Sequence, residues 1–114
     1  MRRLSLPSAQ KIGQRLGTFA GVVAVRERRK AMANMLIAFP DWSDGQRRAT
    51  TRSMFRHLGT TLLEVLWLTK RDENARAAAT RFEGIEPVLD LIRNGKSIVA
   101  FAGHCGNWEW LVYS

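Results

Sequence analysis

The amino-acid sequence predicts an α/β fold, a sandwich in which helices come first and short strands follow. Apolar residues recur at helical spacing through residues 12–39 and again through residues 54–66. By contrast, residues 97–102 form a mostly apolar run with the length of a buried strand. The expected order is helix, helix, short strand, helix, strand and helix, with residues 1–71 mainly helical and residues 81–114 starting the α/β core.

The chain has the size and composition of a single globular domain. It contains 114 residues, of which 46% are hydrophobic and 25% are charged, and its single cysteine excludes an internal disulfide. The uncharged stretch 16–25 is too short to cross the ~30 Å apolar core of a bilayer. Polar residues also interrupt any signal-peptide core near the N-terminus. We therefore expect neither a transmembrane helix in this chain nor secretion.

The first helical region ends at Pro40, and one long helix or a broken one fits its pattern. Its apolar stripe consists of Ile12, Leu16, Phe19, Ala20, Val23, Met32, Met35, Leu36 and Phe39.

A second amphipathic helix follows, and Ser43 and Gln46 match a capping box at its start. Its apolar stripe consists of Met54, Phe55, Leu58, Leu62, Val65 and Leu66. Both stripes fit a packed core or a membrane surface, and we expect core packing to predominate for the Met and Phe side chains.

The second half of the chain combines one ambiguous segment with clearer signals. Residues 70–80 are charged and rich in alanine, which fits either a solvated helical connection or a loop. Residues 82–84 are expected to form a short edge strand. A helix is expected over residues 85–93, because Pro87 is tolerated in a first turn and Gly95 suits a C-terminal cap.

Candidate catalytic residues follow directly after the predicted strand 97–102. His104 and Glu109 are five positions apart, and Gly103 and Gly106 allow a sharp turn into a helix. A histidine accepts a proton from an attacking hydroxyl, while a carboxylate fixes its tautomer and stabilises the imidazolium. Amides at the start of a helix stabilise developing negative charge. Acyl transfer is the leading hypothesis, although the spacing alone also fits a capped helix start with an incidental surface histidine.

Other residues near the pair have structural as well as functional interpretations. Asn107 fits a helix cap or a residue that holds the motif in shape. Trp108 and Trp110 would shield the pair from water or pack in a core, and we expect at least one of them to pack. Cys105 is expected to be a small buried residue rather than a nucleophile. Adjacent side chains on an extended segment point to opposite faces, so His104 is poorly placed to activate its thiol. His57 has no spaced carboxylate or second ligand, so we expect a structural or surface role.

Basic residues are concentrated in the first half of the chain. Residues 1–56 hold 12 of the 18 Lys and Arg but only three acidic residues, and residues 26–30 are the densest cluster. This half suits anionic phospholipid headgroups, to which each basic residue contributes about 1 kcal/mol. An acidic carrier protein or nucleic acid would be attracted equally. For any individual arginine, a solvated helix face is the alternative.

Residues 102–109, Ala-Gly-His-Cys-Gly-Asn-Trp-Glu, closely resemble the motif segment of the bacterial lipid A biosynthesis acyltransferases. This family belongs to the lysophospholipid acyltransferase superfamily, whose signature is a histidine, four residues and then an acid. Cys105 departs from the family, which usually carries a bulkier residue there, but both members of the pair are kept. Further segments resemble the family in order and spacing, namely residues 29–35, Phe39-Pro40-Asp41, Phe55, Leu58-Gly59, Glu64, residues 82–86 and Gly95-Lys96.

The resemblance implies an incomplete glycerolipid-acyltransferase-like α/β sandwich, so that residues 1–114 are the N-terminal part of a single acyltransferase domain. It implies that His104 is the general base and Glu109 its partner, with Gly106, Asn107 and Trp108 binding substrate. The implied reaction moves a fatty acyl group from a thioester to a hydroxyl of a lipid A precursor in lipopolysaccharide biosynthesis. The acyl donor would be a thioester of acyl carrier protein or of coenzyme A. Neither a metal nor another cofactor is implied.

The partners implied by the resemblance are acyl-acyl carrier protein, a lipid acceptor and the anionic inner-membrane surface, whereas nucleic acid is not expected. The implied location is the cytoplasmic face of the bacterial inner membrane, with peripheral attachment or an anchoring segment outside this chain. One rival is a glycerophospholipid or glycolipid acyltransferase with the same pair of residues. A second rival is a non-catalytic truncated remnant that binds anionic membrane. We expect poor solubility of the piece alone, because a strand without neighbours exposes unpaired backbone groups.

Overall fold

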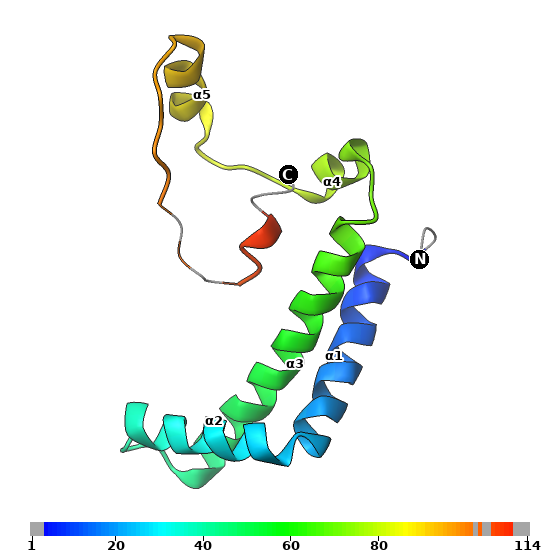
Figure 1. Ribbon diagram of the computed structural model, residues 1–114, viewed down its shortest axis with the longest axis vertical. Coiled ribbons are helices and arrows are strands. Elements are labelled where there is room, and N and C mark those ends of the chain that lie inside the picture. Colours follow the sequence, from blue (N-terminus) through cyan, green and yellow to red (C-terminus); the bar gives the residue numbers. More distant parts are fainter. Residues whose placement is uncertain (1–3, 102, 104–105, 111–114) are drawn as a thin grey trace.

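The computed structural model describes residues 4–101, 103 and 106–110, and its described part is helical. Figure 1 shows the elements, which are α1 (Leu6–Val23), α2 (Val25–Ala38), α3 (Asp44–Leu68), α4 (Glu73–Ala79) and α5 (Glu86–Arg93). No strand occurs among the described residues. None of the helices found there is both long enough and apolar enough to cross a membrane.

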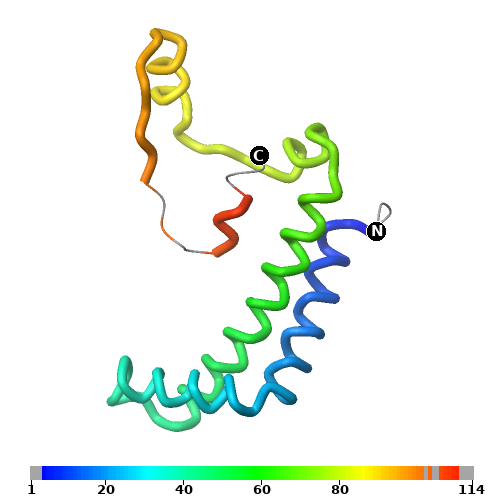
Figure 2. The backbone as a smooth tube through the Cα atoms, in the orientation of Figure 1, coloured from blue at the N-terminus to red at the C-terminus, as the bar shows by residue number. Residues whose placement is uncertain are grey.

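The arrangement is an antiparallel pair of helices with α2 across one end. Helices α1 and α3 lie side by side, and α2 joins them where α1 ends (Figure 1). The chain then leaves α3 through α4, passes through α5 away from the pair, and returns so that residues 106–110 lie beside α3 (Figure 2). The molecule is therefore elongated, with extents of 53 × 37 × 19 Å.

Helices α1 and α3 make contact through small residues. In α1 the buried residues are Ala9, Gly13 and Gly17, spaced four apart, and Gly59 is buried on the facing side of α3. A Cβ atom at Gly13 would lie 2.5 Å from the carbonyl oxygen of Gly59, and one at Gly59 would lie 2.7 Å from the Cα of Gly17. Only glycine permits this approach, so the two backbones touch directly.

This contact leaves large side chains of both apolar stripes exposed, so the core packing expected for their Met and Phe side chains is found for Phe55 but not for Phe19. In α1, Leu16 and Phe19 are 52% and 65% exposed, and in α3 Leu58 and Leu62 are 62% and 58% exposed. Of the stripe predicted for α3, Phe55 is the buried residue, at 8% exposure. Glycine allows a shorter interhelical distance than leucine does, so the glycine face of α1 makes the contact and the larger side chains remain outside.

The break between α1 and α2 answers whether the first region is one helix or two. Ala24 has φ −79° and ψ 62°, which lies outside the helical region, and it separates the two helices. The Nη1 atom of Arg28 donates hydrogen bonds to the carbonyl oxygens of Gly21 and Val22, at 3.0 and 3.2 Å. These bonds satisfy carbonyls left open at the end of α1, which stabilises the bend.

The predicted capping box at the start of α3 is confirmed. The hydroxyl of Ser43 accepts from the amide of Gln46 at 3.3 Å, and the side-chain oxygen of Gln46 accepts from the amide of Ser43 at 2.8 Å. Arg47, only 9% exposed, donates to the carbonyl oxygens of residues 39, 40 and 42 and to the carboxylate of Asp44. One guanidinium therefore holds the turn between α2 and α3 closed.

The second half confirms the predicted helix and lacks the predicted strands. Residues 70–80 contain the short helix α4, which decides between the helical and loop alternatives in favour of a helix. Helix α5 has Pro87 in its first turn and is followed by Gly95 at φ +70°, as expected. Residues 82–84 and 97–101 form no strand. A strand requires a partner for its backbone groups, and the described residues provide none, so the α/β core stays a prediction.

Gly59→Ala is expected to lower the free energy of unfolding by about 1–3 kcal/mol, because a methyl group at this position overpacks the contact with α1. Urea denaturation followed by circular dichroism measures this change. Gly45→Ala in the same helix is the matched control, because a Cβ there has its nearest neighbour at 3.8 Å. The control should be neutral or stabilising by up to about 1 kcal/mol. Equal stability of the two variants would refute the glycine contact.

Asp44 should make stability depend on acidic pH. The hydrogen bond from Arg47, and then its positive charge, hold the pKa of the Asp44 carboxyl below its ordinary value. A lowered folded-state pKa stabilises the protein above the unfolded value of about 3.9, and this contribution is lost as the pH falls through the folded value. Compared with Asp44→Asn, the parent chain should therefore lose stability below about pH 4. Parallel pH profiles for the two chains would contradict this assignment.

Candidate functional site

The predicted motif is described in part. His104 and Cys105 lie outside the described residues, so the structure does not give the geometry of the predicted His104–Glu109 pair. Glu109 is half-buried and lies in a short helical turn with Trp110. Gly106 has φ +69°, in the left-handed region that favours glycine, which confirms the sharp turn expected there.

Asn107 attaches the motif segment to α3. Its Nδ2 atom donates to Glu64 Oε2 at 3.1 Å and to the carbonyl oxygen of Thr61 at 3.4 Å. The side chain thus holds the motif against α3, which was the second interpretation of this residue, while its backbone oxygen accepts from the amide of Trp110 at 3.1 Å. The Oδ1 atom is buried and has no hydrogen-bond partner among the described residues.

Glu64 joins three parts of the chain. Its Oε1 atom accepts from Gln10 Nε2 of α1 at 2.7 Å, while Oε2 accepts from Asn107. One carboxylate therefore connects α1, α3 and the motif segment with two charge-assisted hydrogen bonds, which are the stronger kind. In the sequence, Glu64 belongs to a segment that resembles the family, and no role for it is predicted there. Its position four residues after Thr60 and three before Trp67 carries no local signal of this contact.

Aromatic contacts hold the other side of the motif segment. The Trp110 ring is parallel to that of Trp67 in α3, with centroids 6.2 Å apart, and its Nε1 atom donates to Thr80 Oγ1 at 2.7 Å. The Arg71 guanidinium lies 4.8 Å from the Trp67 ring centroid, and Trp67 Nε1 donates to the carbonyl oxygen of Leu4 at 2.9 Å. The expectation that at least one of the two motif tryptophans packs is confirmed by Trp110, and Trp108 is 36% exposed.

These contacts place Glu109 between two anchors, Asn107 and Trp110. Both anchors bind the C-terminal half of α3, so the short helical turn that contains Glu109 is held beside that helix (Figure 1). His57, also on α3, is exposed, which favours the surface role over the structural role among the two alternatives expected for it. Among the described residues, no group of three or more His, Cys, Asp or Glu is arranged to hold a metal ion.

A match to a known family covers almost the whole chain. Residues 1–112 match the bacterial lipid A biosynthesis acyltransferases. The chain belongs to this family. The resemblance seen in the motif and in the upstream segments is thereby confirmed.

The individual relatives of this lipid A acyltransferase share low sequence identity with it. The lipid A biosynthesis myristoyltransferase of Escherichia coli and the lipid A biosynthesis acyltransferase 1 of Shigella flexneri are each 27% identical over 90 residues, covering 79% of the chain. The lipid A biosynthesis acyltransferase of Haemophilus influenzae is 24% identical over 94 residues, covering 82% of the chain. The chain spans only 28% to 30% of the length of these relatives. No solved structure matches it.

Glu64→Gln should loosen the motif segment. The amide NH₂ group that replaces one carboxylate oxygen cannot accept from Gln10 or Asn107, and losing a hydrogen bond to a charged group costs about 1.5–3 kcal/mol. Hydrogen exchange at the Trp110 amide should become faster, and the near-ultraviolet circular dichroism of the Trp67–Trp110 stack should weaken. Glu83→Gln is the matched control, since Glu83 is 75% exposed and pairs only with Arg81 in the structure described. Unchanged exchange in Glu64→Gln would rule out this anchor.

Proposed function

We propose that the chain is the N-terminal part of an acyltransferase that moves a fatty acyl group from a thioester to a hydroxyl of a lipid A precursor in lipopolysaccharide biosynthesis. The observation that carries this proposal is the family match over residues 1–112, which includes the whole His104-to-Glu109 motif. The relatives, named as a myristoyltransferase and two acyltransferases of lipid A biosynthesis, support the same reaction. The donor would be acyl carrier protein or coenzyme A thioester.

The proposed chemistry assigns one role to each member of the pair. His104 takes the proton from the acceptor hydroxyl as its oxygen attacks the thioester carbonyl, and Glu109 orients the imidazole and stabilises its protonated form. Collapse of the tetrahedral intermediate breaks the C–S bond, and the imidazolium returns the proton to the thiolate sulfur. The products are an ester and a free thiol, so the histidine is regenerated without a metal or a further cofactor.

The anchoring of the motif supports these roles. Glu109 lies between Asn107 and Trp110, which are both attached to α3, so the backbone that carries its side chain is fixed on both sides. Such fixing of an orienting group lowers the cost of reaching the reactive geometry. Gly106, Asn107 and Trp108 are proposed to contact substrate. Residues 97–102 are proposed to become a strand of an α/β core when partner strands are present.

The proposed working place is the cytoplasmic face of the bacterial inner membrane. Twelve Lys and Arg in residues 1–56, opposed by three acidic residues, favour an anionic lipid surface. Exposed apolar side chains on α1 and α3 such as Phe19 and Leu58 suit the same surface. An acidic acyl carrier protein would be attracted by the same charge.

The test is transfer of labelled acyl groups from acyl carrier protein to a lipid A precursor, made with the chain together with any sequence that follows it in its gene. His104→Ala should reduce the rate by about 10²–10⁴-fold, because it removes the general base. Glu109→Gln should reduce it as well, through the loss of the orienting charge. His57→Ala is the matched control and should leave the rate unchanged, since this histidine is exposed on α3.

Three results would change the conclusion. Full activity of His104→Ala would refute the proposed base. Transfer to a lysophospholipid but not to the lipid A precursor would favour a glycerophospholipid acyltransferase with the same pair. Lack of transfer to either acceptor, with membrane binding retained, would favour a non-catalytic remnant.

A further inference from the structure

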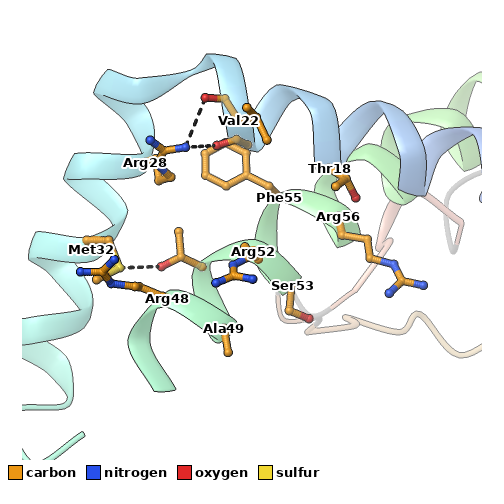
Figure 3. Close-up of a pocket in the computed structure, with 12 residues that line it drawn as sticks. Thr18, Val22, Arg28, Met32, Arg48, Ala49, Arg52, Ser53, Phe55 and Arg56 are labelled. Carbon is orange, nitrogen blue, oxygen red and sulfur yellow. Dashed lines mark hydrogen bonds between the residues drawn. The ribbon is translucent and has the colours of Figure 1, made fainter. Parts of the chain in front are cut away.

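A pocket of about 650 Å³ lies where α1, α2 and α3 meet. Arginines line it from two helices, with Arg28 on α2 and Arg48, Arg52 and Arg56 on α3 (Figure 3). No acidic residue lines it, and the described residues of the motif segment do not contribute to it. The pocket is thus a concave site formed by the three N-terminal helices, with a largely apolar lining and with solvent-exposed arginines from α3.

The four arginines of the pocket differ in whether their side chains make hydrogen bonds within the protein. Arg28 donates to the carbonyl oxygens at the end of α1, and Arg56 Nη2 donates to Gln14 Oε1 at 2.8 Å. The side chains of Arg48 and Arg52 make no hydrogen bond or ion pair among the residues that the structure describes, and the charge of Arg48 contributes to the lowered pKa of Asp44 one turn before it. Arg48, Arg52 and Arg56 are spaced four apart on one face of α3, an arrangement in which like charges repel. An anion in the pocket would relieve this repulsion.

The other part of the pocket is apolar. Phe55 is 8% exposed, and its ring packs over Gly21, where a Cβ atom would lie only 3.1 Å from the Phe55 Cγ. Val22 lies next to this ring, and Met32 lines the pocket from α2 with its thioether (Figure 3). The hydroxyl of Thr51 donates to Met32 Sδ at 3.5 Å, a weak hydrogen bond between α3 and α2. The pocket therefore offers guanidinium donors next to an apolar wall.

This combination identifies the chemical class of the ligand. Guanidinium groups bind phosphate oxygens in a bidentate manner, and an apolar wall favours a hydrocarbon chain. The volume lies within the range of about 300–1,000 Å³ that is typical of small-molecule sites, which suits a headgroup and the first part of a chain. A carrier protein would require a broader and flatter surface than this concave site provides.

We propose that this pocket binds one anionic phospholipid, with the phosphate on Arg48 and Arg52 and the acyl chain against Phe55, Val22 and Met32. The exposed apolar residues of α1 outside the pocket, such as Phe19 and Val23, would receive the rest of the chain. The inference deepens the membrane-surface part of the proposed function and does not depend on acyl transfer. Its effect is to fix these helices on the membrane at one defined point.

The test is calorimetric binding of dihexanoyl phosphatidylglycerol to the purified chain, below the concentration at which this lipid forms micelles. We expect saturable binding with one lipid per chain. Inorganic phosphate and dihexanoyl phosphatidylcholine should each bind at least tenfold more weakly, because one lacks the acyl chains and the other lacks the net negative charge. Val22→Thr, which keeps the side-chain shape, should weaken binding of the lipid but not of phosphate.

Two double variants that each remove two positive charges distinguish binding in the pocket from attraction to the basic surface as a whole. The double variant Arg48→Gln with Arg52→Gln should weaken phosphatidylglycerol binding at least tenfold, with an unchanged circular dichroism spectrum. Arg26→Gln with Arg29→Gln removes the same charge from exposed positions of α2 outside the pocket and should change binding less than twofold.

Several outcomes would overturn the proposal. Equal losses in the two double variants would show binding by diffuse charge. Equal affinity for inorganic phosphate would show a phosphate site without a lipid. Binding of acyl carrier protein that requires Arg48 and Arg52, in the absence of phosphatidylglycerol binding, would show a protein-docking surface. Because the measurement uses no acyl transfer, loss of the proposed enzymatic activity would leave its result unaffected.

Discussion

The direct backbone contact of α1 with α3 at Gly13, Gly17 and Gly59 determines the positions of the other features. Because the two helices lie this close, Gln10 reaches Glu64 and Arg56 reaches Gln14. The same contact brings the end of α1 over the ring of Phe55 and so forms one wall of the arginine-lined pocket. A wider helix pair would separate Glu64 from Gln10 and would remove the wall that α1 contributes to the pocket.

Local signals in the sequence predicted the helices better than their packing. The capping box at Ser43 and the proline and glycine around α5 act through neighbouring residues, so they could be recognised from spacing alone. The buried faces could not, because the apolar stripes compete with a glycine face that allows a shorter interhelical distance. The strands predicted at residues 82–84 and 97–102 could not be judged from the sequence of each segment alone. A strand forms only with a partner, and the described residues supply none.

The family could be predicted from the motif residues, whereas the contacts that hold the motif could not. Asn107 and Glu64 are 43 positions apart, and Trp110 and Thr80 are 30 apart, so no periodic pattern connects them. Glu64 also lies on an amphipathic helix, where a single carboxylate is ordinarily a solvated side chain. Its role depends on the chain's returning to α3 after α5, which is a property of the tertiary structure.

The row of arginines on α3 also has a consequence for how the protein responds to ionic strength. Arg48, Arg52 and Arg56 repel one another across successive turns, at a cost of about 0.2–0.5 kcal/mol for each neighbouring pair. Salt screens this repulsion, because the Debye length shortens from about 30 Å at 0.01 M to about 8 Å at 0.15 M. The same screening weakens the attraction of these side chains for an anion. Higher salt therefore relieves the repulsion within this row of arginines while it weakens anion binding, so these two effects of the same side chains respond to salt in opposite directions.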